Sequence, residues 1–260
     1  MKESVKNIFV VWQDTKSKKQ FPVGQLTYIH NNHEAYQFNY IHGVTEAISY
    51  GFQPFPGFPE LDATYVSTDL FPFFQNRILL PARDEYEAFV TSLGLSPSEA
   101  KPTDILARSG GRRATDTIEI FAPAEIIENN EKDYNIARYY FLLHGLSHMK
   151  ECAQDLATDM VKEGDRIFMM HDIQNPVDGK AMLLRTGDYC SIGFIPRYLL
   201  SDMWILVTLH RDLFFYVYKI NRPPSPIQQR IVCIAEAKVN KDFISCSAET
   251  FISYSNAAKV

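Results

Sequence analysis

The sequence predicts an α+β fold made of two small β-rich domains. The 260 residues are 46% hydrophobic and 22% charged, a composition typical of a folded globular chain of one or two domains. Short apolar or alternating runs bounded by turn residues recur in both halves, which indicates β-strands. A polar, acidic stretch at residues 123–133 indicates a linker between the halves. We therefore expect a domain boundary near residues 125–135, with one domain at 1–130 and the other at 131–260.

The first half combines a small antiparallel sheet with short helices. Strands are expected at residues 8–12, 23–28, 35–40 and 118–121, with turns at 16–19 and 31–32. Residues 51–59 are too rich in proline and glycine for a regular helix. Helices are expected at residues 71–80, where Pro72 is tolerated in the first turn, and at 84–93, with further helix starts near 96 and 102.

The second half is richer in strands. They are expected at residues 139–144, 166–171, 181–185, 191–195, 214–220 and 231–239. One helix is expected at residues 152–161 and another from Pro196 to about residue 210. Gly187 and Asp188 are typical of a hairpin turn between two of the strands.

The charge is uneven along the chain. The net charge is −5, but residues 1–133 hold 12 basic and 18 acidic side chains, whereas residues 134–260 hold 14 and 13. This argues against a protein that coats nucleic acid through bulk charge, but it allows a local basic site in the second half. No run approaches the roughly 18 apolar residues that a spanning helix needs, and no signal-peptide pattern is present. We therefore expect no membrane segment and a cytoplasmic protein.

No catalytic or cofactor motif stands out. The G-x-S-x-G, protein-kinase and P-loop signatures are absent, so we expect no enzyme activity and no cofactor. Asp165, His171, Asp172 and Asp178 leave a metal-dependent nuclease or phosphoesterase open as an alternative. Their irregular spacing suits the capping of turns and loops better than a metal cluster.

The cysteines and the paired histidines indicate no metal site. The cysteines lack a C-x-x-C pair and are typical of free thiols in a reducing compartment; they are Cys152, Cys190, Cys233 and Cys246. His144 and His148 have the spacing of zinc ligands on a helix, but their segment begins as a strand and holds no third ligand. We therefore expect no metal ion.

The densest charged loop is the Gly-Gly-Arg-Arg run at residues 110–113. Its glycines leave backbone N–H groups accessible, and the guanidiniums of Arg112 and Arg113 suit a phosphate or a protein partner. The run lacks the Lys-Ser/Thr end of a P-loop. The alternative is a turn whose arginines pair with nearby carboxylates.

The most specific pattern of the chain lies in residues 164–200. A Gly-Asp turn enters an alternating strand, an Asn-Pro-Val-Asp loop follows at 175–178, and a later strand ends in Ile-Gly-Phe-Ile-Pro-Arg at 192–197. Over about residues 136–240 this order resembles the HIRAN domain, a small module found alone in bacteria and at the N-terminus of helicase-like DNA repair remodellers. The resemblance implies a β-barrel or curled sheet with one or two helices, and recognition of the 3′ end of single-stranded DNA.

The residues of this pattern have a chemistry that fits a DNA end. A Pro-stiffened loop holds Asn175 and Asp178, and the carboxylate of Asp178 can accept a hydrogen bond from a terminal hydroxyl. Arg197, at the start of a helix, can bind a phosphate. The alternative is that Asn175 and Asp178 only cap their own loop. The resemblance implies binding roles for these three residues and for the strand end at 145–148.

The sequence departs from the HIRAN pattern at two places. Val177 stands where the family has a stacking aromatic residue, and Ser147 and His148 stand where it has an arginine–aromatic pair. Stacking contributes about 1–3 kcal/mol per base, so these changes lower the expected affinity. We expect His148 and Phe194 to replace the missing aromatic residues in part.

Three short motifs mark the first half. They are Val-Gly-Gln-Leu at 23–26, Tyr-Gln-Phe-Asn-Tyr at 36–40 and Phe-Phe-Gln-Asn-Arg-Ile-Leu at 73–79. Over about residues 8–115 their order resembles the N-terminal subdomain of HipA-type toxin kinases. No kinase domain follows, as in the HipS-type proteins of toxin–antitoxin systems. The resemblance implies a module that docks a protein partner, and the alternative is a generic β-rich fold with helices.

Together these patterns predict a non-catalytic bacterial adaptor that binds nucleic acid. The second domain recognises single-stranded 3′ ends or damaged DNA in this hypothesis, and the first domain docks a protein partner. The alternative is an antitoxin or regulator that binds a HipA-type toxin kinase. Co-expression with such a kinase separates the two functions, because only the second requires a stable complex.

Overall fold

The computed structural model describes residues 4–30, 34–149, 161–209, 212–223 and 225–257. The turn expected at 31–32, Cys152 and nearly all of the helix expected at 152–161 lie outside these residues. The chain divides into two compact units, which are described separately. The first unit holds Met1–Thr91, Leu95–Pro123 and Cys246–Val260, and the second holds Ser92–Gly94 and Ala124–Ser245. Each unit has its own sheet, so the predicted α+β class with two β-rich parts is confirmed.

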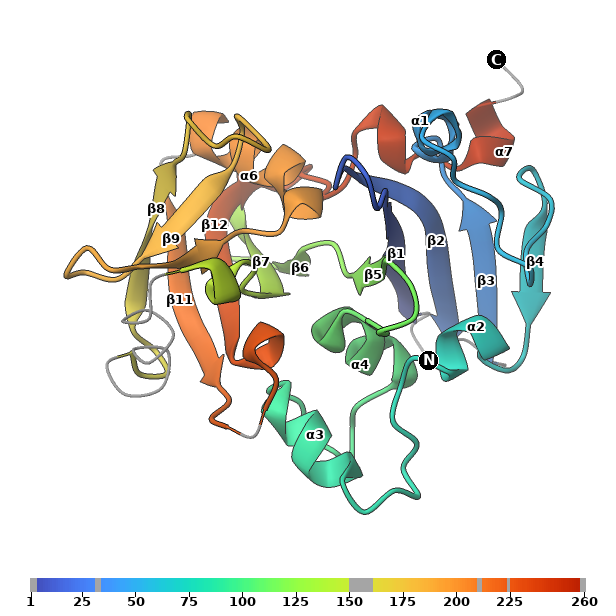
Figure 1. Ribbon diagram of the computed structural model, residues 1–260, viewed down its shortest axis with the longest axis horizontal. Coiled ribbons are helices and arrows are strands. Elements are labelled where there is room, and N and C mark those ends of the chain that lie inside the picture. The colour runs from blue at the N-terminus through green and yellow to red at the C-terminus, as the bar shows by residue number, and fades with distance from the viewer. Residues whose placement is uncertain (1–3, 31–33, 150–160, 210–211, 224, 258–260) are drawn as a thin grey trace. The chain divides into compact units, whose positions relative to one another are not determined.

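The first unit is built on a five-stranded antiparallel sheet in the order β4-β3-β2-β1-β5 (Figure 1). The strands are β1 (Ser4–Gln13), β2 (Gln20–His30), β3 (Glu34–Tyr40), β4 (Thr64–Ser67) and β5 (Ile118–Phe121). Residues along β3 alternate between half-buried and buried positions, as a strand with one face on a core requires. Phe38 and Tyr40 supply the buried side of this strand.

Short helices complete the first unit. They are α1 (Val44–Ser49), α2 (Pro72–Gln75), α4 (Pro102–Ser109) and α7 (Tyr254–Ala257), while α3 (Tyr86–Ser92) runs across the division between the two units. The helix expected at 71–80 is therefore much shorter than predicted. The chain turns after α2, where the guanidinium of Arg77 reaches Asp116 at 2.6 Å and the carbonyl of Gly111 at 3.0 Å. This tertiary contact outweighs the local preference for a longer helix.

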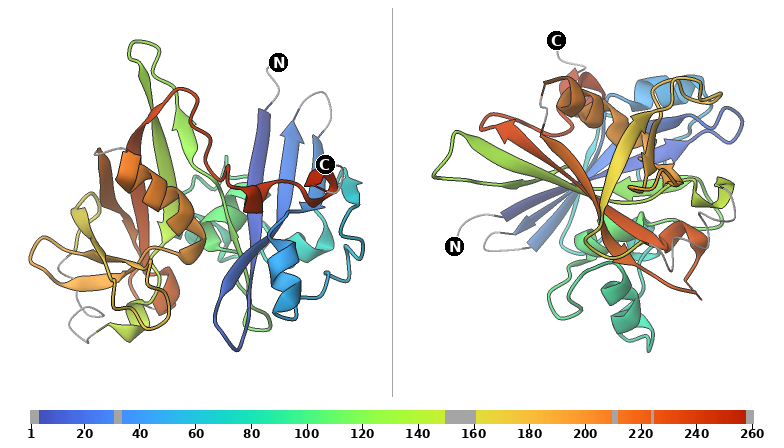
Figure 2. Two further views of the ribbon diagram at one scale, coloured as in Figure 1. Left: turned by 90° about the horizontal axis from the view of Figure 1, so that it is seen from above. Right: turned by 90° about the vertical axis from the view of Figure 1, so that its left-hand side faces the viewer.

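The second unit is a seven-stranded antiparallel sheet in the order β10-β9-β8-β11-β12-β7-β6. Its strands are β6 (Glu125–Ile127), β7 (Tyr134–Leu142), β8 (Arg166–His171), β9 (Met182–Arg185), β10 (Ser191–Phe194), β11 (Leu213–Ile220) and β12 (Ile231–Asn240). Figure 2 shows how these strands twist and fan out around one another. The stretch that was expected to be a linker contains β6. Its residues 125–127 form a strand because they pair with β7.

The sheet of the second unit curls until its two ends meet. His144, two residues after β7, forms an isolated bridge with Phe194 at the end of β10. Each backbone N–H of this pair donates to the other carbonyl, at 3.0 and 2.8 Å. Gly193 makes the approach feasible, because a Cβ at this position would lie 2.5 Å from the carbonyl oxygen of His144. The expected curled sheet is confirmed, and this seam partly closes it into a barrel.

One helix packs on the barrel. A turn of 3-10 helix, η2 (Arg197–Leu199), leads into α6 (Leu200–Leu209), as the sequence predicts from Pro196 onward. The buried carboxylate of Asp202 accepts hydrogen bonds from Tyr139 on β7 at 2.8 Å and from Ser245 at 2.6 Å. None of the helices in the described parts of the chain is long and apolar enough to cross a membrane.

The C-terminal segment belongs to the first unit. The predicted domains placed residues 131–260 together, whereas Cys246–Val260 groups with the N-terminal sheet and the division after β5 falls between residues 123 and 124. Phe251 explains the difference, because its ring packs edge-on against Phe9 at 4.9 Å. Ser253 also bridges to Ile41. Such long-range packing leaves no local signal in the sequence.

Candidate functional site

The Asn-Pro-Val-Asp loop connects β8 to β9 and is held by its own side chains. The side-chain oxygen of Asn175 accepts hydrogen bonds from the backbone N–H groups of Val177 and Asp178, at 3.0 and 3.1 Å. Its amide nitrogen donates to Asp172 at 3.0 Å. Asn175 therefore has the capping role that the sequence left open as an alternative. Its amide fixes the loop backbone and thereby the position of Asp178.

Asp178 faces the predicted arginine. One carboxylate oxygen accepts a hydrogen bond from the N–H of Lys180 at 2.9 Å, and the other lies 3.7 Å from Nε of Arg197. The two side chains are 25% and 28% exposed. A carboxylate and a guanidinium are thus juxtaposed in a setting that water reaches, as a site for a polar or charged ligand requires.

Arg197 reaches this position through the pairing of β9 and β10. After β10, the N–H of Ile195 donates to the carbonyl of Met182 at 3.0 Å, which ties the chain to the start of β9. Pro196 then caps η2, and Arg197 is the first residue of that helical turn. Because β9 and β10 are antiparallel, the loop before β9 and the turn after β10 lie at the same end of this strand pair.

The other predicted residues gather at the seam of the barrel. Ser147 and His148 lie on η1 (Leu146–His148), which packs beside β10. Both are exposed, whereas Phe194 is half-buried. Gly145 adopts a positive φ of 72°, and a Cβ there would lie 3.1 Å from the Phe194 ring. The structure thus places Ser147 and His148 near Phe194, three residues before Arg197.

The Gly-Gly-Arg-Arg run lies in the first unit and is already paired in part. Arg112 contacts the buried carboxylate of Glu119 at 2.8 Å. Gly110 and Gly111 both adopt positive φ, which explains the two glycines in this turn. The alternative of an arginine paired with a carboxylate therefore holds for Arg112, while Arg113 lies exposed in the same turn.

The residues of the nuclease alternative have other partners. Nε2 of His171 contacts the carbonyl of Gly179 at 2.7 Å, and its ring lies edge-on to Trp204. Asp165 accepts a hydrogen bond from the N–H of Lys162. Within the described residues, no three His, Cys, Asp or Glu side chains gather as metal ligands do.

Three of the cysteines are free thiols, as predicted; they are Cys190, Cys233 and Cys246. Cys233 is fully buried on β12. Burial raises the pKa of its thiol well above the usual value, because the thiolate would lose its hydration. The Cys233 thiol therefore stays protonated, and its role is to pack in the core rather than to react.

An alternating series of arginine and aromatic side chains was not predicted. Its members, from β9–β10 to β11, are Tyr189, Arg185, Phe168, Arg166 and Phe214, and we call it the Arg–aromatic ladder. The guanidinium of Arg185 lies 4.4 Å from the Tyr189 ring centre and 5.1 Å from that of Phe168. The guanidinium of Arg166 lies 5.2 Å from Phe168 and 4.6 Å from Phe214.

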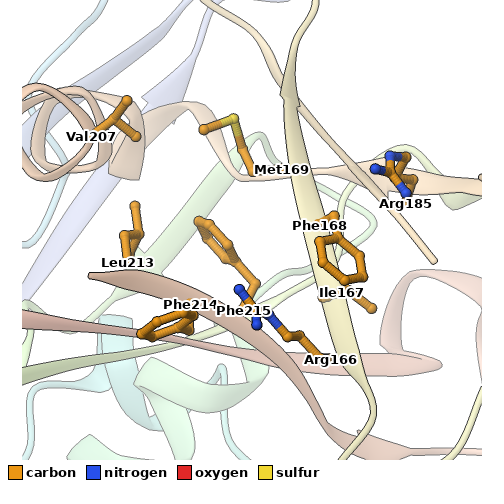
Figure 3. A pocket seen from close by; sticks show the side chains of 9 residues that line it. All are labelled: Arg166, Ile167, Phe168, Met169, Arg185, Val207, Leu213, Phe214 and Phe215. Atoms are coloured by element: carbon orange, nitrogen blue, oxygen red, sulfur yellow. The ribbon is translucent and has the colours of Figure 1, made fainter. Parts of the chain in front are cut away.

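Strand register assembles this ladder. Arg185 on β9 is the direct cross-strand partner of Phe168 on β8. Arg166 and Phe168 are two residues apart and share one face of β8. The alternation of arginine and phenylalanine along β8 was the only local signal, because the partners on β9 and β11 depend on strand order. Figure 3 shows Phe214, Arg166, Phe168 and Arg185 following one another from left to right.

Comparisons with known proteins show weak similarities to two solved structures. No family model matches the chain, and a search of curated proteins returns no match. Among solved structures, a protein from Lactobacillus plantarum is similar with 16% identity and a TM-score of 0.31, covering 40% of this chain and 97% of that one. The HIRAN domain of human HLTF is similar with 13% identity and a TM-score of 0.28, covering 40% and 73%. The resemblance of residues 8–115 to HipA-type kinases stays a prediction.

Proposed function

We propose that the second unit binds single-stranded DNA at a free 3′ end and catalyses no reaction. The juxtaposition of Asp178 and Arg197 on a fixed loop carries this proposal. Neither side chain is buried, so an incoming strand reaches both without unfolding the loop. The HIRAN resemblance of residues 136–240 supports the same function from sequence, since it assigns these two residues to the DNA end.

Each residue has one task in this proposal. The carboxylate of Asp178 accepts a hydrogen bond from the terminal 3′-hydroxyl. The guanidinium of Arg197 contacts a nearby phosphate and compensates the negative charge that Asp178 brings to the site. Asn175 binds no DNA; it keeps the loop in place through its bonds to Val177, Asp178 and Asp172.

The bases need a surface to stack on, and Val177 offers no ring. Phe194 and His148 are two aromatic residues at the seam, beside the turn that leads to Arg197. Each stacked base contributes about 1–3 kcal/mol in sites of this kind. We therefore expect the end itself to bind weakly and its hydroxyl to supply most of the selectivity.

Fluorescence anisotropy with a labelled 15-nucleotide strand at about 50 mM salt tests the proposal. Asp178→Ala and Arg197→Ala should each weaken binding about tenfold or more, because each removes a charged hydrogen-bond partner of the end. Glu163→Ala is the matched control, since it removes an acidic side chain that pairs with Lys219 and lies outside the site. Equal affinity of wild type and both site variants would place the DNA elsewhere.

The first unit is assigned a partner only by resemblance. It holds 12 basic and 15 acidic side chains, and the second unit holds 14 and 16, so net charge does not separate the roles of the two units. We propose docking of a protein partner for this unit, with a HipA-type kinase as the alternative named by its motifs. Co-purification of the full chain with a co-expressed kinase of this type is the direct test.

A further inference from the structure

The Arg–aromatic ladder borders a cavity with an unusual lining. The cavity has a volume of about 310 Å³ and lies between β8 and β11, with Val207 of α6 at its edge. Two arginines and three phenylalanines contribute to its wall, together with aliphatic side chains and no carboxylate. Figure 3 shows both guanidiniums at this cavity. A mixture of positive charge and ring faces is the chemistry with which proteins hold single-stranded nucleic acids.

The two arginines are not neutralised by acidic partners. Within the described parts of the chain, no carboxylate lies within ion-pair distance of Arg166 or Arg185. Arg185 donates to the carbonyl of Thr186 at 2.8 Å, and otherwise both guanidiniums contact rings. Asp165 and Asp188 line a second cavity that Arg166 also borders, but their oxygens bond to Lys162 N–H and the Thr186 hydroxyl rather than to the guanidinium. The ladder therefore keeps two positive charges available for an anion.

Tyr189 adds a second observation. It is 77% exposed, which is unusual for a large aromatic side chain in a folded domain. Its backbone adopts a φ of 67°, a left-handed conformation that costs a non-glycine residue about 1 kcal/mol or more. The hairpin turn between β9 and β10 accounts for this backbone conformation, and it leaves the exposed ring beside the Arg185 guanidinium and accessible to a ligand.

We propose that the Arg–aromatic ladder is a second DNA-contacting subsite, which holds nucleotides of the single strand at some distance from its 3′ end. This inference rests on the proposed function of the second unit. Arg166 and Arg185 contact phosphates, and the exposed faces of the ladder rings stack on bases. Stacking of this kind accepts any base, so the subsite is expected to read no sequence.

The hairpin of β8 and β9 connects the two subsites. The ladder extends along β8 to Phe168, and β8 ends at His171 before the loop with Asp178, so about 10 Å of strand lies between the ladder and the loop at about 3.3 Å per residue. Met170 shares the ladder face of β8 two residues beyond Phe168 and is 45% exposed. Its side chain continues an accessible apolar track from the ladder towards the loop.

Single variants of one ladder arginine test the subsite. Arg185→Gln should weaken binding of a 15-nucleotide strand about fivefold to tenfold, and the slope of log affinity against log salt should fall by about 0.7 per lost phosphate contact. Lys241→Gln is the matched control, because it removes one exposed charge beyond the end of β12. Arg185→Lys should restore the salt slope but not the full affinity, since lysine keeps the charge and lacks the planar face.

Phe168→Leu provides a variant that leaves every charge in place. It should lower affinity severalfold without changing the salt slope, because it removes the ring between the two guanidiniums. Thermal unfolding of each variant establishes that the second unit is folded. If Arg185→Gln and Phe168→Leu bind the strand with wild-type affinity and salt slope, the ladder is not a DNA subsite.

A closed circular single strand separates this proposal from the proposed function. The circle has no 3′ end, so its binding does not depend on a terminal hydroxyl at Asp178. Loss of circle binding in Arg185→Gln supports the ladder even if Asp178→Ala has no effect on linear strands. Conversely, a circle that fails to bind wild type contradicts the ladder, while a preference for linear strands with a free end would still support the Asp178 site.

Discussion

At the residue scale, Tyr40 shows how one buried hydroxyl fixes an irregular segment. Its oxygen accepts a hydrogen bond from the N–H of Phe55 at 2.7 Å and donates to the carbonyl of Phe58 at 2.8 Å. Burial raises the pKa of Tyr40 well above its usual value, so the hydroxyl keeps its proton. The Pro-rich segment 51–59, which cannot form a helix, is anchored to β3 in this way.

Tyr40→Phe should therefore destabilise the first unit by about 2–3 kcal/mol, because a buried N–H and a buried carbonyl lose their partner. Tyr65→Phe is the matched control. The Tyr65 hydroxyl also bonds a backbone N–H and carbonyl, both of Glu60, but at an exposed place where water replaces it. Urea unfolding should show a cost for Tyr65→Phe of about 0.5 kcal/mol or less. Equal costs for the two substitutions would contradict this account.

The same scale shows where sequence reasoning about the site stops. The loop pattern placed Asn175, Asp178 and Arg197 near one another, and the structure brings Asp178 to Arg197. It could not decide which side chains cap the loop, because capping and ligand binding use the same chemical groups. The structure assigns the capping to the Asn175 amide, with one Asp178 oxygen bonded to Lys180 N–H.

At the scale of elements, the seam between His144 and Phe194 holds the curled sheet closed. Gly193→Ala should destabilise the second unit by about 2–4 kcal/mol, because the added Cβ would collide with the His144 carbonyl. Gly179→Ala is the matched control, since a Cβ at that position meets no atom within 4 Å. Thermal unfolding followed by circular dichroism compares them. Similar midpoints for both variants would show that the seam contributes little.

Strands were easier to predict than their partners. β8 occupies residues 166–171 and β5 occupies residues 118–121, as alternation and apolar runs indicated. β6 was missed because its run Glu-Ile-Ile is only three residues long, lies in an otherwise polar stretch and becomes a strand only by pairing with β7. The Arg–aromatic ladder was missed for the same reason, since cross-strand neighbours follow from the order of strands in the sheet.

At the scale of the whole molecule, the chain returns to its first unit after completing the second. Backbone hydrogen bonds tie His42 to Ile252 at 2.8 Å and Gly43 to Thr250 at 3.0 Å, and Phe251 is buried beside Phe9. A polar stretch indicated where the first division lies, but no local sequence feature predicted that the chain goes back to the first unit at residue 246. Predicted domains that are continuous in sequence therefore misplace residues 246–260.

A chain ending at Ser245 tests this organisation. Trp12 lies in the first unit and Trp204 in the second, and they are the two tryptophans of the chain. In a Trp204→Phe background, the urea midpoint reported by Trp12 should fall markedly on truncation, because the first unit loses the buried Phe251 ring. In a Trp12→Phe background, the midpoint reported by Trp204 should stay within error. A fall in the Trp204 midpoint alone would contradict the assignment.

The selectivity of the whole protein for a free 3′-hydroxyl tests the central claim most directly. Anisotropy at about 50 mM salt compares a 15-nucleotide strand ending in a 3′-hydroxyl with the same strand ending in a 3′-phosphate. Wild type should prefer the hydroxyl about tenfold or more, because a phosphate offers Asp178 repulsion in place of a donor, and Asp178→Asn should lose that preference. Equal affinity of wild type for the two strands would contradict recognition of a DNA end by Asp178.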